Sequence, residues 1–338
     1  MQRRILLVRT DRVGDVVMIT PLIRELQKTF PEAFIGTLTN ENSVDVLLHN
    51  PNIDVIISDD LKKDTFWSTV KKIRSYKFTD GLLIMPTERA AYQMFFAGIK
   101  NRIGVGRKIY EVVTFMKSVS RNKYIPLRHE ADYCMDMGRK LGVRSDNLTP
   151  EIYLNDAEKF NGEKILVSEG VNISDKKIIV HTGSGKSSRN WSEEKYLGLL
   201  KKILEIKNNA VIILTAKEMS SEFKEEACKL DNKRIFFTDD KIKRLRDLIC
   251  IIANTDMMIA SSTGPLHLAS ALNKKTIGLY CHRRMNCAAH WGALGEKSVN
   301  LEVSKEYCDA NCSPDKEVCN FENGISIDEV IKHINNDL

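Results

Sequence analysis

Residues 257–272 have the residue types of an anion-binding turn. An apolar run is followed by Ser262, Thr263 and Gly264, and the proline after Gly264 suits the first turn of a helix because its missing N–H would have no partner there. Ser262 or Thr263 can cap such a helix, and glycine lets the backbone approach a ligand closely. Free N–H groups and the positive end of the helix dipole attract anions. We expect a phosphate-binding turn with His267 one helical turn further on; a strand–helix turn without a ligand is the alternative.

A second turn of this kind lies near the start of the chain. The apolar run 5–8 leads into a polar segment with Arg12 and Gly14, and an amphipathic helix follows. Asp15 comes directly after the glycine, where the helix dipole favours a carboxylate. Asp15 is therefore a candidate general base facing a cleft. A helix-start carboxylate without chemistry fits the same position.

The loop over residues 181–191 contains two cations suited to a diphosphate. Arg189 can bind two phosphate oxygens at once, and Lys186 adds a point charge. The loop is not a Walker A motif, because that motif needs a glycine five residues before Gly185, where this chain has Val180. The helix is expected to start near Ser192 instead. Neither strand–helix turn has the G-x-G-x-x-G pattern of NAD binding.

The cysteines suggest a metal site only weakly. Cys308, Cys312 and Cys319 follow Cys281, His282, Cys287 and His290. Their spacing lacks the paired C-x2-C of strong zinc motifs. We expect free thiols and no bound metal, with a structural metal at Cys308, Cys312 and Cys319 as the alternative.

The elements that must position these residues alternate between strand-like and helix-like runs, which predicts an α/β protein with parallel sheets. The expected strands are 5–8, 34–38, 55–58, 81–85, 177–180, 210–214, 234–237, 257–260 and 276–280. The pattern weakens into polar, loop-like sequence over about 142–170, where we place a linker. The predicted domains are 1–155 and 170–338, with a cleft between them at the carboxyl ends of the strands.

The composition of the chain limits the classes of partner. Its 338 residues suffice for two domains, and residues 1–150 hold 24 of the 51 basic but only 17 of the 45 acidic side chains. A basic first half suggests an acidic partner such as a phosphorylated lipid or an anionic sugar. We do not expect nucleic acid as a partner, because the basic residues are scattered and the sequence contains no recognisable nucleic-acid-binding motif. The sequence shows neither a signal peptide nor a membrane-spanning run, so we expect a cytoplasmic protein with reduced cysteines.

Taken together, these segments resemble glycosyltransferase family 9, the heptosyltransferases of the lipopolysaccharide inner core. The resemblance covers about residues 4–335 and is carried by R-x-D-R-V-G-D-V-V-x-x-T-P from Arg9, by residues 96–104, and by the S-T-G-P-L-H-L-A-S-A-L turn. His129-Glu130, the basic loop before Trp191 and the cysteine-containing stretch near the carboxyl end also fit.

The resemblance implies a GT-B fold, in which two Rossmann-like domains face each other across a cleft. The first would bind the acceptor, on the side of Arg12 and Gly14, and the second a nucleotide-sugar. Asp15 would be the general base of an inverting, metal-independent transfer that needs no cofactor. The diphosphate would contact a set of residues in the second domain: Lys186, Arg189, Ser262, Thr263, Gly264 and His267.

The implied substrates are ADP-heptose and the anionic glycolipid of the lipopolysaccharide inner core, so the enzyme would act peripherally at the inner face of the inner membrane. One position departs from the family pattern: Ser262 stands where many members have aspartate, which bears on the donor sugar. Two alternatives stay open. The chain could use another nucleotide-sugar for capsule or O-chain assembly, or it could be a catalytically silent nucleotide-binding scaffold.

Overall fold

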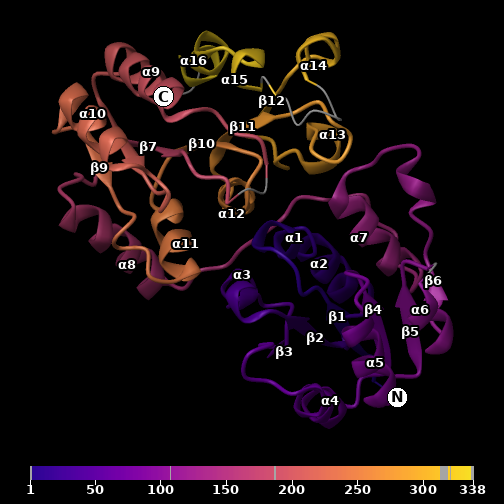
Figure 1. Ribbon diagram of the computed structural model, residues 1–338. Coiled ribbons are helices and arrows are strands. Elements are labelled where there is room, and N and C mark those ends of the chain that lie inside the picture. Colours follow the sequence, from indigo (N-terminus) through magenta and orange to yellow (C-terminus); the bar gives the residue numbers. More distant parts are fainter. Residues whose placement is uncertain (1, 107, 186–187, 313–318, 320, 336–338) are drawn as a thin grey trace. The chain divides into compact units, whose positions relative to one another are not determined.

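The computed structural model of the chain describes residues 2–106, 108–185, 188–312, 319 and 321–335. It divides into two compact units, Met1–Tyr153 and Leu154–Leu338 (Figure 1). Within the described residues, each unit contains one six-stranded sheet in which all pairs of neighbouring strands are parallel. The predicted α/β class is confirmed.

The sheet of the first unit has the strand order β3-β2-β1-β4-β5-β6. β1 is its centre and pairs Leu6 with Gly36 of β2 on one side and with Gly81 of β4 on the other. The strands are β1 Arg4–Val8, β2 Phe34–Thr39, β3 Val55–Ser58, β4 Asp80–Leu83, β5 Asn101–Gly104 and β6 Lys117–Ser118. The helices are α1 Val13–Val17, α2 Thr20–Thr29, η1 Glu41–Ser43, α3 Val44–Leu47, α4 Phe66–Ser75, α5 Glu88–Phe96, α6 Ile109–Val113, η2 Asn122–Tyr124 and α7 Glu130–Arg139.

The second sheet has the order β12-β11-β10-β7-β8-β9, with β10 and β7 at its centre. Its strands are β7 Lys176–His181, β8 Ala210–Leu214, β9 Ile235–Phe237, β10 Met257–Ser261, β11 Lys275–Tyr280 and β12 Ser298–Glu302. The helices are α8 Asp156–Ser168, α9 Glu193–Ile206, α10 Ser221–Asp231, α11 Leu245–Ala253, α12 Gly264–Ala271, α13 Ala288–Trp291, α14 Lys305–Asn311, α15 Phe321–Gly324 and α16 Ile327–Asn335.

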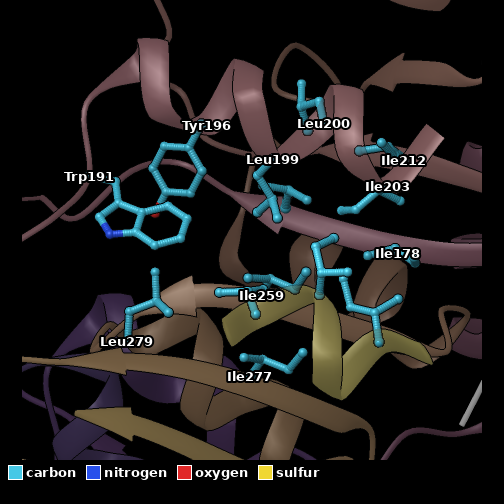
Figure 2. Close-up of a cluster of buried hydrophobic side chains, with 14 of the residues drawn as sticks. Ile178, Trp191, Tyr196, Leu199, Leu200, Ile203, Ile212, Ile259, Ile277 and Leu279 are labelled. Carbon is cyan, nitrogen blue, oxygen red and sulfur yellow. The ribbon is translucent and has the colours of Figure 1, made fainter. Parts of the chain in front are cut away.

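The core of the second unit explains why the sequences of its strands are continuous apolar runs. Ile178, Ile212 and Ile259 come from three neighbouring strands and are fully buried against Leu199 and Ile203 of α9 (Figure 2). A parallel sheet is covered by helices on both faces, so both sides of each strand must be apolar. Trp191 and Tyr196 close this core next to the loop after β7.

The second half of the stretch expected to be a loop-like linker is helical, while residues 142–155 contain no helix or strand. Within 142–170 the structure forms α8, which begins with a capping box between Asn155 and Glu158. α8 packs on α11, and Gly162 allows this contact, since a Cβ there would lie 2.1 Å from the carbonyl oxygen of Cys250. The prediction of a loop was wrong over Asp156–Ser168, because the pairing of α8 with α11 cannot be seen in the local pattern.

Three further strands, β5, β6 and β12, were not among the expected ones. No helix among the described residues combines the length and the apolar character needed to cross a membrane.

Candidate functional site

The end of β1 carries a buried arginine that holds three carboxylates. Arg9 directly follows the strand and is 3 % exposed. Its Nε donates to Oδ1 of Asp11 at 2.8 Å, its Nη1 donates to Oε1 of Glu130 at 2.8 Å, and its Nη2 donates to Oδ1 of Asp15. One guanidinium therefore joins the turn after β1, the start of α1 and the start of α7.

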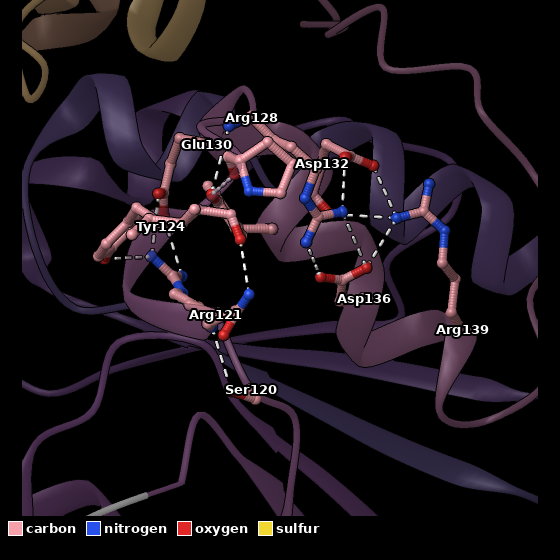
Figure 3. Close-up of polar contacts among 12 residues, drawn as sticks. Ser120, Arg121, Tyr124, Arg128, Glu130, Asp132, Asp136 and Arg139 are labelled. Atoms are coloured by element: carbon pink, nitrogen blue, oxygen red, sulfur yellow. Dashed lines mark hydrogen bonds and ion pairs between the residues drawn. The ribbon is translucent and has the colours of Figure 1, made fainter.

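A second arginine completes the surroundings of Glu130. Arg121 donates from Nη1 to Oε2 and from Nη2 to Oε1 of Glu130, at 3.0 and 3.1 Å (Figure 3). Nη1 of Arg121 also donates to the hydroxyl of Tyr124 at 3.1 Å. Glu130 is 3 % exposed, so these contacts replace the water that a carboxylate would otherwise need.

Two of the three acids that contact Arg9, Asp11 and Glu130, have pKa values shifted in opposite directions. Burial raises the pKa of Asp11 to about 6, an effect that Arg9 opposes and Asp15 reinforces. For Glu130, burial also acts to raise the pKa, but the charges of Arg9 and Arg121 outweigh it and hold the pKa below its ordinary value. Glu130 is thus a permanent anion near neutral pH, while Asp11 gains a proton in mildly acidic solution.

Asp15 lies in the first turn of α1, as the sequence predicts. Arg9 holds its Oδ1, and Oδ2 has no hydrogen-bond partner among the residues that the structure describes. The side chain of Asp15 is 17 % exposed. Arg12 precedes α1 as an exposed N-cap residue, and Gly14 is buried under the turn. The structure therefore places all three predicted residues in one turn.

The sequence analysis did not select Arg9, Asp11, Glu130 and Arg121. A signal was present for the first two, because charged residues that directly follow a buried central strand lie at the edge where ligands bind in open α/β sheets. No comparable signal joined them to Glu130, which is 121 residues from Arg9 in the chain.

In the second unit, Asn190 connects the ends of three elements. Its Nδ2 donates to the carbonyl of Thr182 after β7 at 2.5 Å. Its Oδ1 accepts from the hydroxyl of Tyr196 in α9 at 2.7 Å and from that of Ser261 at the end of β10 at 2.6 Å. These contacts fix the backbone next to Arg189.

Arg189 lines a cavity of about 650 Å³ in this unit. The lining is mostly polar and comprises Ser184, Ser188, Arg189, Asn190, Asn286, Cys319, Phe321 and Glu322. The predicted diphosphate ligand Lys186 lies outside the described residues. α9 begins after Ser192, whose hydroxyl accepts from the N–H of Lys195 at 3.2 Å, and this start agrees with the expected one.

The turn that the sequence predicts to bind an anion lies between β10 and α12. Thr263 is the N-cap residue and proline occupies the first turn, but no side chain makes the expected capping hydrogen bond. The Thr263 hydroxyl is buried and has no hydrogen-bond partner among the described residues. The expectation that Ser262 or Thr263 caps the helix through its side chain was therefore wrong.

The rest of this turn is held firmly in place. The N–H of Ser262 donates to the carbonyl of Leu279 at 3.1 Å, and Gly264 starts α12. His267 lies one turn further on and is 3 % exposed, with its ring 6.1 Å from that of Trp291. Because Ser261 binds Asn190, the start of α12 and the loop of Arg189 belong to one connected group.

Cysteines do not gather into a metal site in the part of the chain that the structure describes. No group of three or more histidine, cysteine or acidic side chains there is arranged to hold a metal ion. Cys312 Sγ and Cys319 Sγ lie 3.9 Å apart, and Cys308 is buried beside the core of the second unit.

The two units, each with a parallel six-stranded sheet and helices, have the GT-B fold of glycosyltransferases. Two solved structures cover nearly the whole chain. The family 9 glycosyltransferase of Veillonella parvula has a TM-score of 0.83 at 19 % identity and covers 99 % of this chain and 97 % of its own. The ADP-heptose lipopolysaccharide heptosyltransferase II of Escherichia coli has a TM-score of 0.74 at 16 % identity, with 99 % and 98 % covered.

The chain belongs to glycosyltransferase family 9 (heptosyltransferase), whose model matches residues 66–321. It is 27 % identical, over 88 % of both chains, to a Haemophilus influenzae protein named only as an unconfirmed glycosyltransferase. It is 24 % identical to the lipopolysaccharide core heptosyltransferase OpsX of the same species, over 82 % of this chain and 78 % of that one. The family predicted from the sequence is confirmed.

Proposed function

We propose that the protein is an inverting glycosyltransferase that moves heptose from ADP-heptose onto the inner core of lipopolysaccharide. The domain of residues 1–155 binds the glycolipid acceptor, and the domain of residues 170–338 binds the nucleotide-sugar. Family membership and the relatives named as heptosyltransferases support this assignment. The protein works in the cytoplasm, at the inner face of the inner membrane.

The observation that carries the proposal is the ion pair between Arg9 and Asp15. Arg9 holds one carboxylate oxygen and leaves the other without a hydrogen bond among the described residues, which suits a general base. As the acceptor hydroxyl attacks the anomeric carbon, its proton passes to Oδ2 of Asp15. The bond from that carbon to the diphosphate breaks, its electron pair leaves with the nucleoside diphosphate, and the configuration inverts.

The leaving group is stabilised by the second unit. Arg189 extends into a polar cavity large enough for a ligand, and the unpartnered hydroxyl of Thr263 stands at the positive end of α12. Lys186, Ser262, Gly264 and His267 complete the diphosphate site. Because fixed donors and the helix dipole meet the developing charge, the proposed reaction requires neither a metal nor a cofactor.

The acceptor is expected beside the turn that holds Arg12 and Gly14. Arg12 is exposed and precedes Asp15 by one helical turn, so it can contact an anionic group of the acceptor while Asp15 faces the hydroxyl. The basic excess of residues 1–150 supports an anionic partner.

A second candidate keeps the transferase and changes the donor. Ser262 can donate a hydrogen bond but brings no charge to a sugar hydroxyl. Because of this serine, other nucleotide-sugars of capsule or O-chain assembly should also be tested as donors. A catalytically silent scaffold is a third possibility, and the buried charges around Asp15 argue against it, because such a network is costly to keep without a role.

The first test is thermal unfolding with saturating ADP, UDP, GDP or CMP. A ligand at 100 times its Kd adds about 2.7 kcal/mol of stability. We expect a rise in Tm with ADP that Arg189→Ala abolishes and that Arg144→Ala, an exposed arginine of the first unit, leaves unchanged. A rise in Tm with another nucleotide alone would show that the donor carries that nucleotide instead of ADP. No rise in Tm with any nucleotide would favour the catalytically silent scaffold.

A further inference from the structure

The first unit exposes a cluster of large apolar side chains on α6 and the turn that follows it. Ile109 is 83 % exposed, Val112 72 % and Phe115 80 %, and Val113 is exposed beside them. We call these four residues the α6 ridge. Single exposed apolar residues are normal on soluble proteins, but a contiguous group of this size marks an interaction surface.

The ridge continues onto the neighbouring helices. α6 packs beside α5, and α5 beside α4, along one face of the first sheet (Figure 1). Trp67 of α4 is 62 % exposed and its ring lies 5.2 Å from that of Phe96 in α5, which in turn contacts Phe95. Exposed aromatic rings therefore extend the apolar surface beyond α6.

Arg102 joins the aromatic group to the ridge. Its guanidinium lies 5.1 Å from the ring centre of Phe95, and its Nε donates to the carbonyl of Thr114 at 3.1 Å. Thr114 directly precedes Phe115 in the chain. Arg102 is itself buried, so it fixes the end of α6 against α5 instead of separating the two apolar groups with a solvated charge.

The backbone holds Phe115 outward at a conformational cost. Phe115 has φ +54°, a left-handed conformation that a bulky side chain rarely adopts. The N–H of Phe115 donates to the carbonyl of Val112 at 3.0 Å, and that of Met116 to the carbonyl of Glu111 at 2.9 Å, which locks this turn. A left-handed residue with such bonds is a common way to end a helix, and here it holds the exposed Phe115 at the end of α6.

The charge around the ridge identifies its partner. Residues 95–125 contain seven lysines and arginines, of which Arg102 is buried and Arg121 is paired with Glu130. The single acidic residue of this segment, Glu111, is buried. Lys100, Lys108 and Lys117 are exposed and lie within four residues of the exposed apolar residues in the sequence. An apolar surface bordered by lysines matches the interface of a bilayer with anionic lipids, where acyl chains meet phosphate headgroups.

We propose that the α6 ridge, with Trp67, Phe95 and Phe96, is the surface by which the protein docks on an anionic lipid bilayer. The ridge inserts among the acyl chains, and the three lysines bind lipid phosphates. The proposal rests on the proposed function in one respect, since docking through the first unit keeps it at the membrane that contains a glycolipid acceptor.

The test is flotation of the full chain, without nucleotide-sugar, on vesicles of phosphatidylethanolamine with phosphatidylglycerol. We expect the triple variant Ile109→Ser, Val112→Ser, Phe115→Ser to bind these vesicles at least about tenfold more weakly than the wild type. The matched control replaces three exposed apolar residues of the second unit, Phe160→Ser, Val167→Ser and Ile173→Ser, and should bind as the wild type does. Equal thermal midpoints would show that both triple variants fold.

A variant without the three lysine charges separates the electrostatic from the apolar contribution to vesicle binding. Lys100→Gln, Lys108→Gln, Lys117→Gln should weaken binding to the anionic vesicles and reduce its dependence on salt, without changing the weak binding to phosphatidylcholine vesicles. Equal losses in the ridge and control variants would overturn the proposal. So would a concentration-dependent dimer that the ridge variant abolishes, because a second copy of the chain would then cover the surface. Because flotation needs no catalysis, a failed transfer assay leaves this result intact.

Discussion

Arg9 and Glu130 form a buried ion pair across 121 residues of sequence, with Nη1 and Oε1 2.8 Å apart. The pair fastens the start of α7 to the end of β1 at the point where Asp15 also binds Arg9. The geometry of the proposed base thus depends on a residue far away in the chain.

Removing Arg9 should destabilise the first unit strongly. Arg9→Met leaves Glu130 and Asp11 buried without their main counter-charge, which costs about 3–5 kcal/mol. Urea unfolding of Arg9→Met, Glu130→Gln and the double variant measures the coupling. We expect Glu130→Gln, added to Arg9→Met, to restore part of the lost free energy of unfolding. If the effects of the two substitutions on this free energy were additive, the two residues would not interact.

Asp15→Asn should strongly reduce the rate of sugar transfer while preserving nucleotide binding. A positioned general base contributes about 10²–10⁴-fold to the rate, and the amide cannot accept the proton. We expect kcat for transfer from ADP-heptose to fall within that range with the ADP-induced rise in Tm unchanged. Asp146→Asn, at a carboxylate that is 99 % exposed in the same unit, is the control. A kcat close to that of the wild type would exclude Asp15 as the base.

Asn190→Ala should weaken nucleotide binding without removing any cation. The change leaves the hydroxyls of Tyr196 and Ser261 without their acceptor, which costs about 1–3 kcal/mol, and it frees the backbone beside Arg189. Titration of ADP by calorimetry should give a Kd at least about tenfold higher. Asn232→Ala, at an exposed residue after α10, should leave that Kd unchanged. An unaltered Kd in Asn190→Ala would show that Arg189 is positioned by other contacts.

His181 should make the second unit sensitive to acid. Burial lowers the pKa of this histidine to about 4, and its Nδ1 lies 2.8 Å from the Thr215 hydroxyl. The folded state keeps the imidazole neutral, so its contribution to stability is fully present above the ordinary pKa of about 6.5 and is lost as the pH falls towards 4. We expect a loss on the order of 1–3 kcal/mol over this interval.

Urea unfolding at several pH values between neutrality and pH about 4 checks this expectation. His181→Gln removes the titrating group, so its stability should depend less steeply on pH than that of the wild type. Parallel pH profiles for the two proteins would contradict the assignment.

The local pattern of the sequence predicted much of the secondary structure. Apolar runs such as 210–214 coincide with the observed strand β8, because a strand buried on both faces must be apolar throughout. Ser192 predicted the start of α9 because its capping contact spans only three residues. Asp15 was selected for a similar reason, since a helix start and its carboxylate are neighbours in sequence.

Only the tertiary structure decided which distant groups meet. Three features depend on packing between segments far apart in the chain. They are the pairing of Arg9 with Glu130, the contacts of Asn190 with β7, α9 and β10, and the helix α8 within the expected linker. The sequence by itself determined that this is an α/β protein with two anion-suited turns and a carboxylate at one of them. The partners that hold those groups came from the fold, because burial forces charges into contacts that no local spacing encodes.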